Sequence, residues 1–542
     1  MKTKSKTHIL LVISSLALAP APGHAQADGP LVIIWQAAFG PGPMGGAGWA
    51  NPADFVQTSD GGFLIAGGAN GPANGIRTEP ICGGIADVWV IKIDGEGQRL
   101  WDKSYGGSAG EEVHRIILTP DGGFLLTGTS MSPPSCTKTS PHYPEGALWA
   151  VRCDANGNQL WDQCYLTPAY PALYAYDCVR TADGAYLACG RTAGWGIVKF
   201  DDSGEKLWAM NLGPKGEFFQ LPLAIRETGD GGFIVAGSSD SPTCAQKSSL
   251  YYGGLPQPQV WRGSDFWVVR VDAQGNRVWD KSYGGQSAEQ AYVIHPTSDG
   301  GFMVFGSSQS VPPAVPRLGT KTSPRYGMLD YWIIKIDAEG NQLWDKSYGG
   351  TSDDILTHAE PMPDGGWLLC GQSTSLPFPR GGKTSPRFGG SDFWIVRIDE
   401  QGNRLWDQSF GGSDYEGRGP ALDSAPVPIW LPIKRAADGG FLLVGFSVSP
   451  VSGLKTEPLI SGADYWVLKL GPEPPFLRGE VTAEGKFQLL LIGPPEFQHT
   501  IQGSADLATW VDLVTFQPNP AGKEYWTDPD RLAHRFYRAV RR

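Results

Sequence analysis

Four acidic residues occupy the same position of a sequence unit that recurs along the chain. Each lies four residues after the second glycine of a Tyr-Gly-Gly or Phe-Gly-Gly connection. If the strand after each connection is the innermost of its sheet, these carboxylates lie near the mouth of a central channel. Because hard cations prefer oxygen ligands, such a partial acidic ring predicts a Ca²⁺ site, unless the acids are solvated or cap loop amides. The four residues are Glu111, Glu289, Asp354 and Glu416.

Three tryptophans lie in long connections outside the repeated unit, and they are the candidate ligand-binding residues. Exposed indoles stack on sugar rings or fill pockets at protein interfaces. The alternative is that each covers a hydrophobic end of the fold. The three residues are Trp49, Trp261 and Trp430.

The histidines form no catalytic pattern. Their spacing is not typical of a metal site or of an activated nucleophile, and no Ser/His/Asp set or phosphate-binding loop is recognisable. No catalytic residue is therefore assigned. The histidines considered are His114, His142, His295 and His358.

A basic element recurs in the insertions: Lys or Arg, then Thr, then Ser or Glu, then Pro. A ring of such cations could recognise anionic sugars. Recurrence favours an architectural role, in which each cation pairs with a nearby aspartate such as Asp330 or Asp392 and orders its own loop. The cations are Arg77, Lys138, Lys321, Lys383 and Lys455.

The eight cysteines include no Cys-x-x-Cys pair and no Cys/His cluster, which disfavours a zinc site. Cys178 and Cys189 are equidistant from the Asp183-Gly184 turn, so a hairpin would place them opposite each other, within reach of a disulfide. Two buried thiols in the core are an equally good interpretation.

The first 27 residues predict export. Three lysines precede an apolar run from Ile9 to Ala19, and Ala25-Gln26-Ala27 supplies a small-residue cleavage site. The run is too short to span a bilayer, so it is typical of a signal peptide. We expect a secreted protein, either extracellular or periplasmic or at the cell surface, without a transmembrane segment. A net charge of −11 with no basic stripe argues against a nucleic-acid partner.

The composition predicts the elements that position these residues. Among 542 residues there are 73 glycines, 44 prolines and 20 tryptophans, and only 18% of residues are charged. Such a chain favours many short strands joined by Gly, Pro and Asp turns.

Three signatures recur in a fixed order. An Asp-Gly-Gly turn and apolar strand begins at Asp60, Asp121, Asp183 (where the turn reads Asp-Gly-Ala), Asp230, Asp299, Asp364 and Asp438. An aromatic strand ends at Lys92, Arg152, Lys199, Arg270, Lys335, Arg397 and Lys469. A strand typically reading Trp-Asp-Lys-Ser-Tyr-Gly-Gly contains Trp101, Trp161, Trp208, Trp279, Trp344 and Trp406.

The copy missing from the third signature lies at the N-terminus, where Trp35 to Gly40 aligns with Trp101 to Gly106. In a closed ring of sheets, a first strand that completes the last sheet locks the ring without exposed edges. The sequence therefore predicts an all-β fold, with residues 28–471 forming a seven-bladed β-propeller closed by its N-terminal strand.

Antiparallel alternation gives this propeller two different faces. One carries the short Asp-Gly-Gly and Asp-x-x-Gly-Asn turns, and we call it the turn face. The other, the loop face, carries the long insertions between second and third strands and the Gly-Gly connections to the next blade. Binding usually resides in variable loops on a rigid scaffold, so the loop face is the candidate working surface.

The repeated unit resembles the secreted bacterial propeller repeats found in large surface proteins, most of which have no assigned activity. Its Asp-x-x-Gly-x-x-x-Trp pattern also looks like the tryptophan-docking motif of quinoprotein propellers, which joins neighbouring blades and performs no chemistry. The quinoprotein cofactor site has no counterpart here, because the chain lacks an adjacent cysteine pair.

The tail is expected to be a separate module. Residues 472–476 form a Pro-rich linker, and the alternating apolar residues of 477–542 predict a small β-sandwich. This segment is similar to C-terminal modules of exported bacterial proteins, which implies a role in sorting, surface attachment or spacing. The matching residues are Ser504, Asp506, Leu507, Trp510, Asp528, Pro529 and Arg535 to Ala539.

Together these features predict a secreted, monomeric, non-catalytic scaffold that binds a polysaccharide or a protein through its loop face, without a cofactor other than the possible Ca²⁺. One alternative is a carbohydrate-active hydrolase or lyase that uses the acidic residues at the channel mouth. A second is a purely structural surface or envelope protein.

Overall fold

The computed structural model describes most of the chain outside its first 28 residues. The described residues contain β-strands and no α-helix, and no helix among them could cross a membrane. They are residues 29–42, 48–71, 76–168, 170, 172–213, 220–253, 263–315, 318–378, 382–417, 431–471, 476–481, 487–492, 498–504, 509–516, 523–526 and 536–541.

The described residues form seven four-stranded sheets, here called blades 1 to 7. Blade 1 is β2 (Trp49–Gln57), β3 (Phe63–Asn70), β4 (Asp87–Ile93) and β5 (Arg99–Tyr105). Blade 2 is β6 (Glu111–Leu118), β7 (Phe124–Ser130), β8 (Ala147–Cys153) and β9 (Gln159–Tyr165). Blade 3 is β10 (Tyr174–Arg180), β11 (Tyr186–Arg191), β12 (Trp195–Phe200) and β13 (Lys206–Leu212).

Blade 4 is β14 (Gln220–Glu227), β15 (Phe233–Ser239), β16 (Asp265–Val271) and β17 (Arg277–Tyr283). Blade 5 is β18 (Glu289–Pro296), β19 (Phe302–Ser308), β20 (Asp330–Ile336) and β21 (Gln342–Tyr348). Blade 6 is β22 (Asp354–Pro361), β23 (Trp367–Ser373), β24 (Asp392–Ile398) and β25 (Arg404–Phe410). Blade 7 is β26 (Ile433–Arg435), β27 (Phe441–Ser447), β28 (Asp464–Gly471) and β1 (Val32–Phe39).

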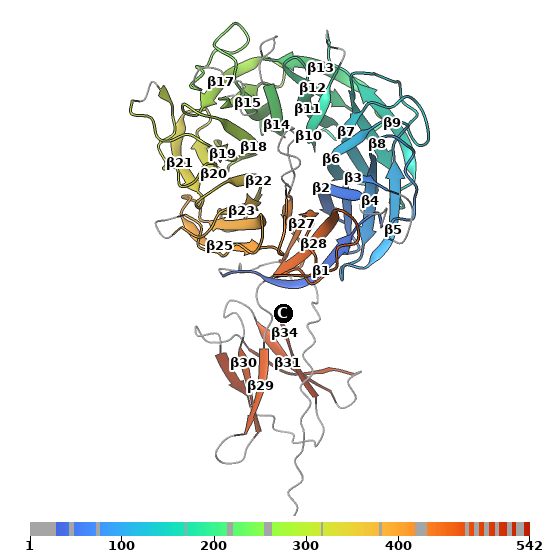
Figure 1. Cartoon of the computed structure of the whole chain (residues 1–542), viewed down its shortest axis with the longest axis vertical. Coiled ribbons are helices and arrows are strands. Elements are labelled where there is room, and N and C mark those ends of the chain that lie inside the picture. The colour runs from blue at the N-terminus through green and yellow to red at the C-terminus, as the bar shows by residue number, and fades with distance from the viewer. Residues whose placement is uncertain are drawn as a thin grey trace, which may run out of the picture. The chain divides into compact units, whose positions relative to one another are not determined.

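The chain divides into two compact units. The larger comprises Trp35–Lys434 and Leu443–Leu468, and the other comprises Arg435–Leu442, the residues from Lys469 onward and those up to Ile34. Within the larger unit the sheets follow one another in a ring, with β2, β6, β10, β14, β18 and β22 on the inside and β5, β9, β13, β17, β21 and β25 on the outside (Figure 1). The fold is therefore a β-propeller.

The N-terminal strand supplies the outer strand of blade 7, as the alignment of Trp35 with Trp101 predicts. The sheet order is β26-β27-β28-β1. Trp466 on β28 donates its indole N–H to the side-chain oxygen of Gln36 on β1 at 3.0 Å. The closing strand is thus fixed by side chains as well as by the sheet.

Neighbouring blades are joined by the outer-strand tryptophans. In the clearest case Trp35 lies against Gly97 of the Asp-x-x-Gly turn of blade 1, where a Cβ on the glycine would be 2.8 Å from the ring. Its indole nitrogen donates to the carbonyl of Gly95 at 3.0 Å. Similar contacts join Trp101 to Gly157, Trp161 to Gly204, Trp279 to Gly340 and Trp344 to Gly402. These contacts are the docking arrangement that the motif predicts.

Each Asp-Gly-Gly turn is tied to the end of the third strand of its own blade. The turn aspartate pairs with the Lys or Arg that ends this strand, in all seven blades of the described chain. Since most of these aspartates are largely exposed, each pair contributes at most about 1 kcal/mol. The pairs are Lys92–Asp60, Arg152–Asp121, Lys199–Asp183, Arg270–Asp230, Lys335–Asp299, Arg397–Asp364 and Lys469–Asp438.

The C-terminal strands form two three-stranded sheets that share one core. The sheet orders are β29-β30-β33 and β32-β31-β34. Leu489 and Leu491 from the first sheet pack with Ile501, Tyr537 and Ala539 from the second, which makes a small β-sandwich. The strands are β29 (Phe476–Val481), β30 (Phe487–Ile492), β31 (His499–Ser504), β32 (Val511–Phe516), β33 (Lys523–Trp526) and β34 (Phe536–Arg541).

The predicted disulfide between Cys178 and Cys189 is wrong. In the β10–β11 hairpin Cys178 pairs with Ala188, and Cys189 pairs with Asp177. The pairing is therefore one residue away from the expected register, and the two thiols point to opposite faces of the sheet. Each packs in a different hydrophobic cluster. In this structure all eight cysteines are reduced.

Candidate functional site

In blades 1, 2, 4, 5 and 6 the long insertion on the loop face is organised by an aspartate of the outer strand. In blade 6, Asp407 accepts hydrogen bonds from the indole N–H of Trp394 at 3.0 Å and from the backbone N–H groups of Thr384 and Ser385 at 3.0 and 2.8 Å. The two hydroxyl residues belong to the Lys-Thr-Ser-Pro element. Equivalent aspartates serve other blades: Asp102, Asp162, Asp280 and Asp345.

The cations of the insertions point into the protein. Lys321 and Lys383 lie 5.2 and 5.4 Å from the ring centres of Trp332 and Trp394. Burial lowers the pKa of both ammonium groups to about 8, although nearby carboxylates act in the opposite direction. Arg77, Lys138, Lys321, Lys383 and Lys455 are all at most 2% exposed. Recognition of anionic sugars by these cations is therefore excluded in this conformation. The cations order their own loops, but Lys321 and Lys383 do so through hydrogen bonds to Ser323 and Ser385 and not through the expected ion pairs with Asp330 and Asp392.

The four repeated acids are buried, which corrects the expectation that they line an accessible channel mouth. Glu111 and Glu289 open the inner strands β6 and β18, and each is 1% exposed. Glu289 accepts a hydrogen bond from the N–H of Gly285 at 3.0 Å and from the hydroxyl of Ser308 at 2.9 Å. Asp354 and Glu416 are equally buried and accept from Gly350 and Gly412. They cap loop amides.

A second carboxylate stands beside each of these acids. A Cβ at Gly106 would lie 2.5 Å from an oxygen of Asp87 and 2.8 Å from one of Glu111, so only glycine fits between them. Burial raises the pKa of Glu289 and of Asp354 to about 7, and it raises those of Asp87 and Asp330 to about 6. The other partners of these pairs are Asp265 and Asp392. The pairs that contain Glu289 and Asp354 are therefore poised to hold a proton near neutral pH.

No three His, Cys, Asp or Glu side chains converge as metal ligands within the ranges that the structure covers. Glu111, Glu289 and Asp354 begin inner strands of three different blades, and Glu416 forms an isolated bridge to Ser447 of blade 7. The Ca²⁺ site stays an untested prediction.

Trp49 is the one of the three candidate tryptophans that falls within the described residues. It begins β2 at the loop face and is partly exposed. Its backbone N–H donates to the side-chain oxygen of Asn70 at 2.8 Å, and its ring lies against Gly68. Ala463, at the end of the blade 7 insertion, forms a parallel bridge with it. Trp261 and Trp430 lie outside the described residues.

Charged side chains on the inner strands form a chain of ion pairs that crosses five consecutive blades. Lys434 of blade 7 pairs with Asp54 of blade 1 at 2.5 Å, and Asp54 lies 3.8 Å from Arg115 of blade 2. Arg115 and Arg226 of blade 4 both pair with Asp177 of blade 3 at 2.6 Å. Burial raises the pKa of Asp177, but the two arginines more than offset it and hold the pKa low.

Two partly buried histidines occupy the inner strands of the remaining blades. His295 of blade 5 contacts the carbonyl of Ala359 in blade 6 at 3.2 Å. Burial lowers the pKa of His295 well below its usual value and also lowers that of His358. Sequence reasoning missed this inner set. The available signal was a charged or imidazole side chain in the middle of an otherwise apolar inner strand.

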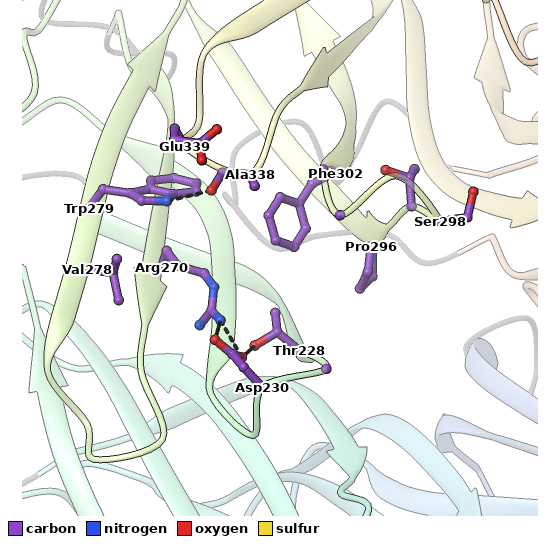
Figure 2. Close-up of a pocket in the computed structure, with 14 residues that line it drawn as sticks. Thr228, Asp230, Arg270, Val278, Trp279, Pro296, Ser298, Phe302, Ala338 and Glu339 are labelled. Carbon is purple, nitrogen blue, oxygen red and sulfur yellow. Dashed lines mark hydrogen bonds and ion pairs between the residues drawn. The ribbon is translucent and has the colours of Figure 1, made fainter.

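A cavity of about 520 Å³ lies on the turn face between blades 4 and 5 (Figure 2). Trp279 and Phe302 line it with their rings 6.5 Å apart, and Arg270 and Asp230 lie at its edge. Arg270 is paired with Asp230 at 2.5 Å, and the indole N–H of Trp279 donates to the carbonyl of Ala338 at 3.0 Å. The charged groups and the indole N–H at this cavity therefore already form contacts of the kind that recur in other blades.

Comparisons with known proteins give distant likenesses. No family model matches the chain. Over 191 residues the chain is 27% identical to the regulatory protein FlaEY of Caulobacter vibrioides, a match that covers 34% of this chain and 20% of that protein. The chain thus spans about a fifth of the length of this curated relative.

Two solved structures show similarity over most of the chain. A mutant puromycin hydrolase is 14% identical with a TM-score of 0.40, and the match covers 82% of this chain and 58% of the hydrolase. The PQQ domain of pyranose dehydrogenase from Coprinopsis cinerea is 10% identical with a TM-score of 0.34, covering 83% of this chain and all of that domain. Neither likeness assigns a function to this chain.

Proposed function

We propose that the protein is an exported, non-catalytic scaffold that binds a polysaccharide or a protein through the loop face of its propeller. The signal-like residues 1–27 would direct export, and residues 477–542 would act as a separate sorting or spacing module. The observation that carries the proposal is the partly exposed indole of Trp49 at the loop-face end of β2.

The surroundings of Trp49 support a binding role. Its backbone is fixed by Asn70 and by the bridge to Ala463, and its ring rests on Gly68, which has no side chain to cover it. A held indole with part of its surface in solvent is a flat apolar platform on which a sugar ring or an apolar side chain can stack. Because the contact joins blades 7 and 1, the platform belongs to a rigid part of the ring.

The chemistry of the repeated acids supports binding in preference to hydrolysis. A glycosidase needs two carboxyl groups that both reach one substrate bond. Glu111, Glu289, Asp354 and Glu416 instead accept hydrogen bonds from their own loops and are at most 1% exposed. Their burial favours a role in holding the connections between blades.

The binding experiment uses the purified full-length protein on an array of bacterial and plant polysaccharides, with soluble turnover products measured in parallel. We expect Trp49→Ala to weaken binding of the selected polysaccharide at least about tenfold, since truncating a central aromatic contact costs about 2 kcal/mol. Trp208→Ala is the matched control, because Trp208 is 36% exposed but lies on the outer strand β13.

Three outcomes would contradict the proposal. The first is equal loss of binding in the Trp49→Ala and Trp208→Ala proteins at unchanged melting temperature. The second is retained binding in a triple variant that also carries Trp261→Ala and Trp430→Ala. The third is product release that disappears in Glu289→Gln, which would favour the carbohydrate-active alternative.

Export is tested separately by N-terminal sequencing of the secreted chain, which should begin at Asp28.

A further inference from the structure

Two cysteines from neighbouring blades meet on the loop face. Cys82 lies in the insertion between β3 and β4 of blade 1, and Cys136 lies in the insertion between β7 and β8 of blade 2. The sulfur of Cys136 is 3.7 Å from the carbonyl oxygen of Cys82, and the two thiols interact directly. Cys136 is exposed and Cys82 is partly buried, so an oxidant in solution reaches the pair.

Both segments are held in place independently of the thiols. The N–H of Cys82 donates to a carboxylate oxygen of Asp87 at 2.5 Å. The turn that contains Cys136 is fixed to the connection between blades 1 and 2, because the N–H of Gly106 donates to the hydroxyl of Thr137 at 2.8 Å. The juxtaposition therefore follows from the fold of the two insertions.

The backbone at Cys136 adopts a conformation that disfavours a side chain. Its φ is 52°, and it is the only non-glycine residue with positive φ in the described ranges. In blade 7 the corresponding turn, Ser452 to Lys455, has Gly453 at this position with a φ of 55°. Glycine adopts this conformation without strain, whereas a residue with a Cβ does not. Blade 2 thus carries a strained cysteine where blade 7 has the unstrained residue.

We propose that Cys82 and Cys136 form a disulfide that links the insertions of blades 1 and 2. This modification goes beyond the binding function and fixes part of the same loop face. The compartment that residues 1–27 predict is one in which disulfides persist. The strain at Cys136 is then the cost of placing its sulfur beside Cys82.

The linkage forms by two thiol–disulfide exchanges with a disulfide oxidant such as oxidised glutathione. The exposed Cys136, as its thiolate, attacks one sulfur of the oxidant and releases the first glutathione thiolate. Cys82 then loses its proton to solvent and attacks the sulfur of Cys136, which expels the second glutathione. One protein dithiol is oxidised and one glutathione disulfide is reduced. Burial raises the pKa of Cys82 to about 12, in keeping with Cys136 reacting first.

The experiment treats the reduced full-length protein with oxidised glutathione and maps a non-reduced digest by mass spectrometry. We expect one linked peptide pair containing Cys82 and Cys136, and a loss of about two titratable thiols per chain. In Cys82→Ser the link should be absent and Cys136 should carry a glutathione adduct. Cys244→Ser is the matched control, because Cys244 is a partly buried cysteine in the equivalent insertion of blade 4, and it should form the link normally.

A second variant keeps the test informative if the Cys82→Ser protein does not fold. Cys136→Gly introduces the residue that blade 7 already uses, so it should remain folded with Cys82 as a free thiol. The proposal is overturned if the oxidised wild-type protein carries separate glutathione adducts on Cys82 and Cys136, or if either cysteine is linked to a different partner. Both results are independent of whether the loop face binds a polysaccharide.

Discussion

The indole nitrogen of Trp466 donates to the side-chain oxygen of Gln36 at 3.0 Å, although 430 residues separate the two in the sequence. The same oxygen accepts from the backbone N–H of Thr456 at 3.1 Å, and the amide of Gln36 donates to the carbonyl of Leu454 at 3.1 Å. In other blades an aspartate takes this place, as Asp407 does for Trp394. One glutamine therefore joins the N-terminal strand to both the third strand and the insertion of blade 7.

We expect Gln36→Ala to destabilise the closure of the propeller. The change removes the acceptor of a buried indole N–H, and leaving such a donor unpaired costs about 1–3 kcal/mol. Gln36→Asp restores the acceptor found in the other blades, so it should lose less stability. Thermal unfolding at one pH measures this, and we expect the melting temperature to decrease in the order wild type, Gln36→Asp, Gln36→Ala. Deletion of residues 28–40 should go further and cause aggregation, because it exposes a sheet edge.

Alanine substitution at two glycines of blade 1 distinguishes the stability cost of backbone strain from the cost of a steric clash. Gly61 and Gly97 both have a φ of 84°, but a Cβ at Gly61 meets nothing within 4 Å whereas one at Gly97 would lie 2.8 Å from the ring of Trp35. Gly61→Ala should cost about 1–2 kcal/mol from the left-handed conformation alone. Gly97→Ala should cost more, because it also displaces the docked tryptophan. Equal denaturant midpoints for the two variants would show that tryptophan docking contributes nothing to the joint between blades.

The fold could be predicted from the sequence because the pattern of turns and strands that specifies one sheet is repeated along the chain. Seven Asp-Gly turns, six of which read Asp-Gly-Gly, and an N-terminal copy of the tryptophan strand determine both the sheets and their closure. The alignment of the N-terminal strand with the strand of Trp101 places Gln36 opposite Asp102, and the structure confirms this match. Gln36 accepts the same indole hydrogen bond as Asp102, although it carries no charge. The hairpin register at Cys178 was beyond such reasoning, since a shift of one residue leaves the pattern intact and reverses the side chains.

The candidate site was less accessible to sequence reasoning. A carboxylate that begins an inner strand can face the channel or its own connection, and the pattern around Glu289 is the same in both cases. The ion pairs of Asp177 join β6, β10 and β14, which no local pattern brings together. The contact of Cys82 with Cys136 likewise depends on how two unequal insertions fold against each other.

The buried acid Glu289 should make stability fall as the pH rises. Its pKa is raised to about 7 in the folded protein from an ordinary value of 4.5. A carboxyl whose folded pKa is raised contributes stability that is fully present below the unfolded pKa and is lost as the pH rises through the folded pKa. The relevant window is therefore about pH 4.5 to 7. Asp265 and Lys321 face the same carboxyl, and burial of Glu289 outweighs the lowering effect of the Lys321 ammonium on its pKa.

We therefore expect Glu289→Gln to gain stability relative to the wild type as the pH increases. The neutral amide avoids the penalty of a buried carboxylate, so the difference in melting temperature between variant and wild type should grow between pH 5 and pH 8. Glu339→Gln is the control, because Glu339 is exposed in the β20–β21 turn and should show a flat difference. A flat difference for Glu289→Gln as well would mean that this carboxyl titrates normally.

The inner ion pairs of blade 3 provide the sharpest contrast between a buried and an exposed charge. Asp177 is 1% exposed and neutralises both Arg115 and Arg226, whereas Asp183 in the same hairpin is 57% exposed and pairs with Lys199. Asp177→Asn removes the carboxylate that pairs with Arg226 and leaves Arg115 with the more distant Asp54, and breaking a buried pair costs about 3–5 kcal/mol. Asp183→Asn should cost less than about 1 kcal/mol, since solvent screens an exposed pair. Denaturant unfolding measures both free energies, and a loss for Asp177→Asn as small as that for Asp183→Asn would mean that the inner strands are held together by packing alone.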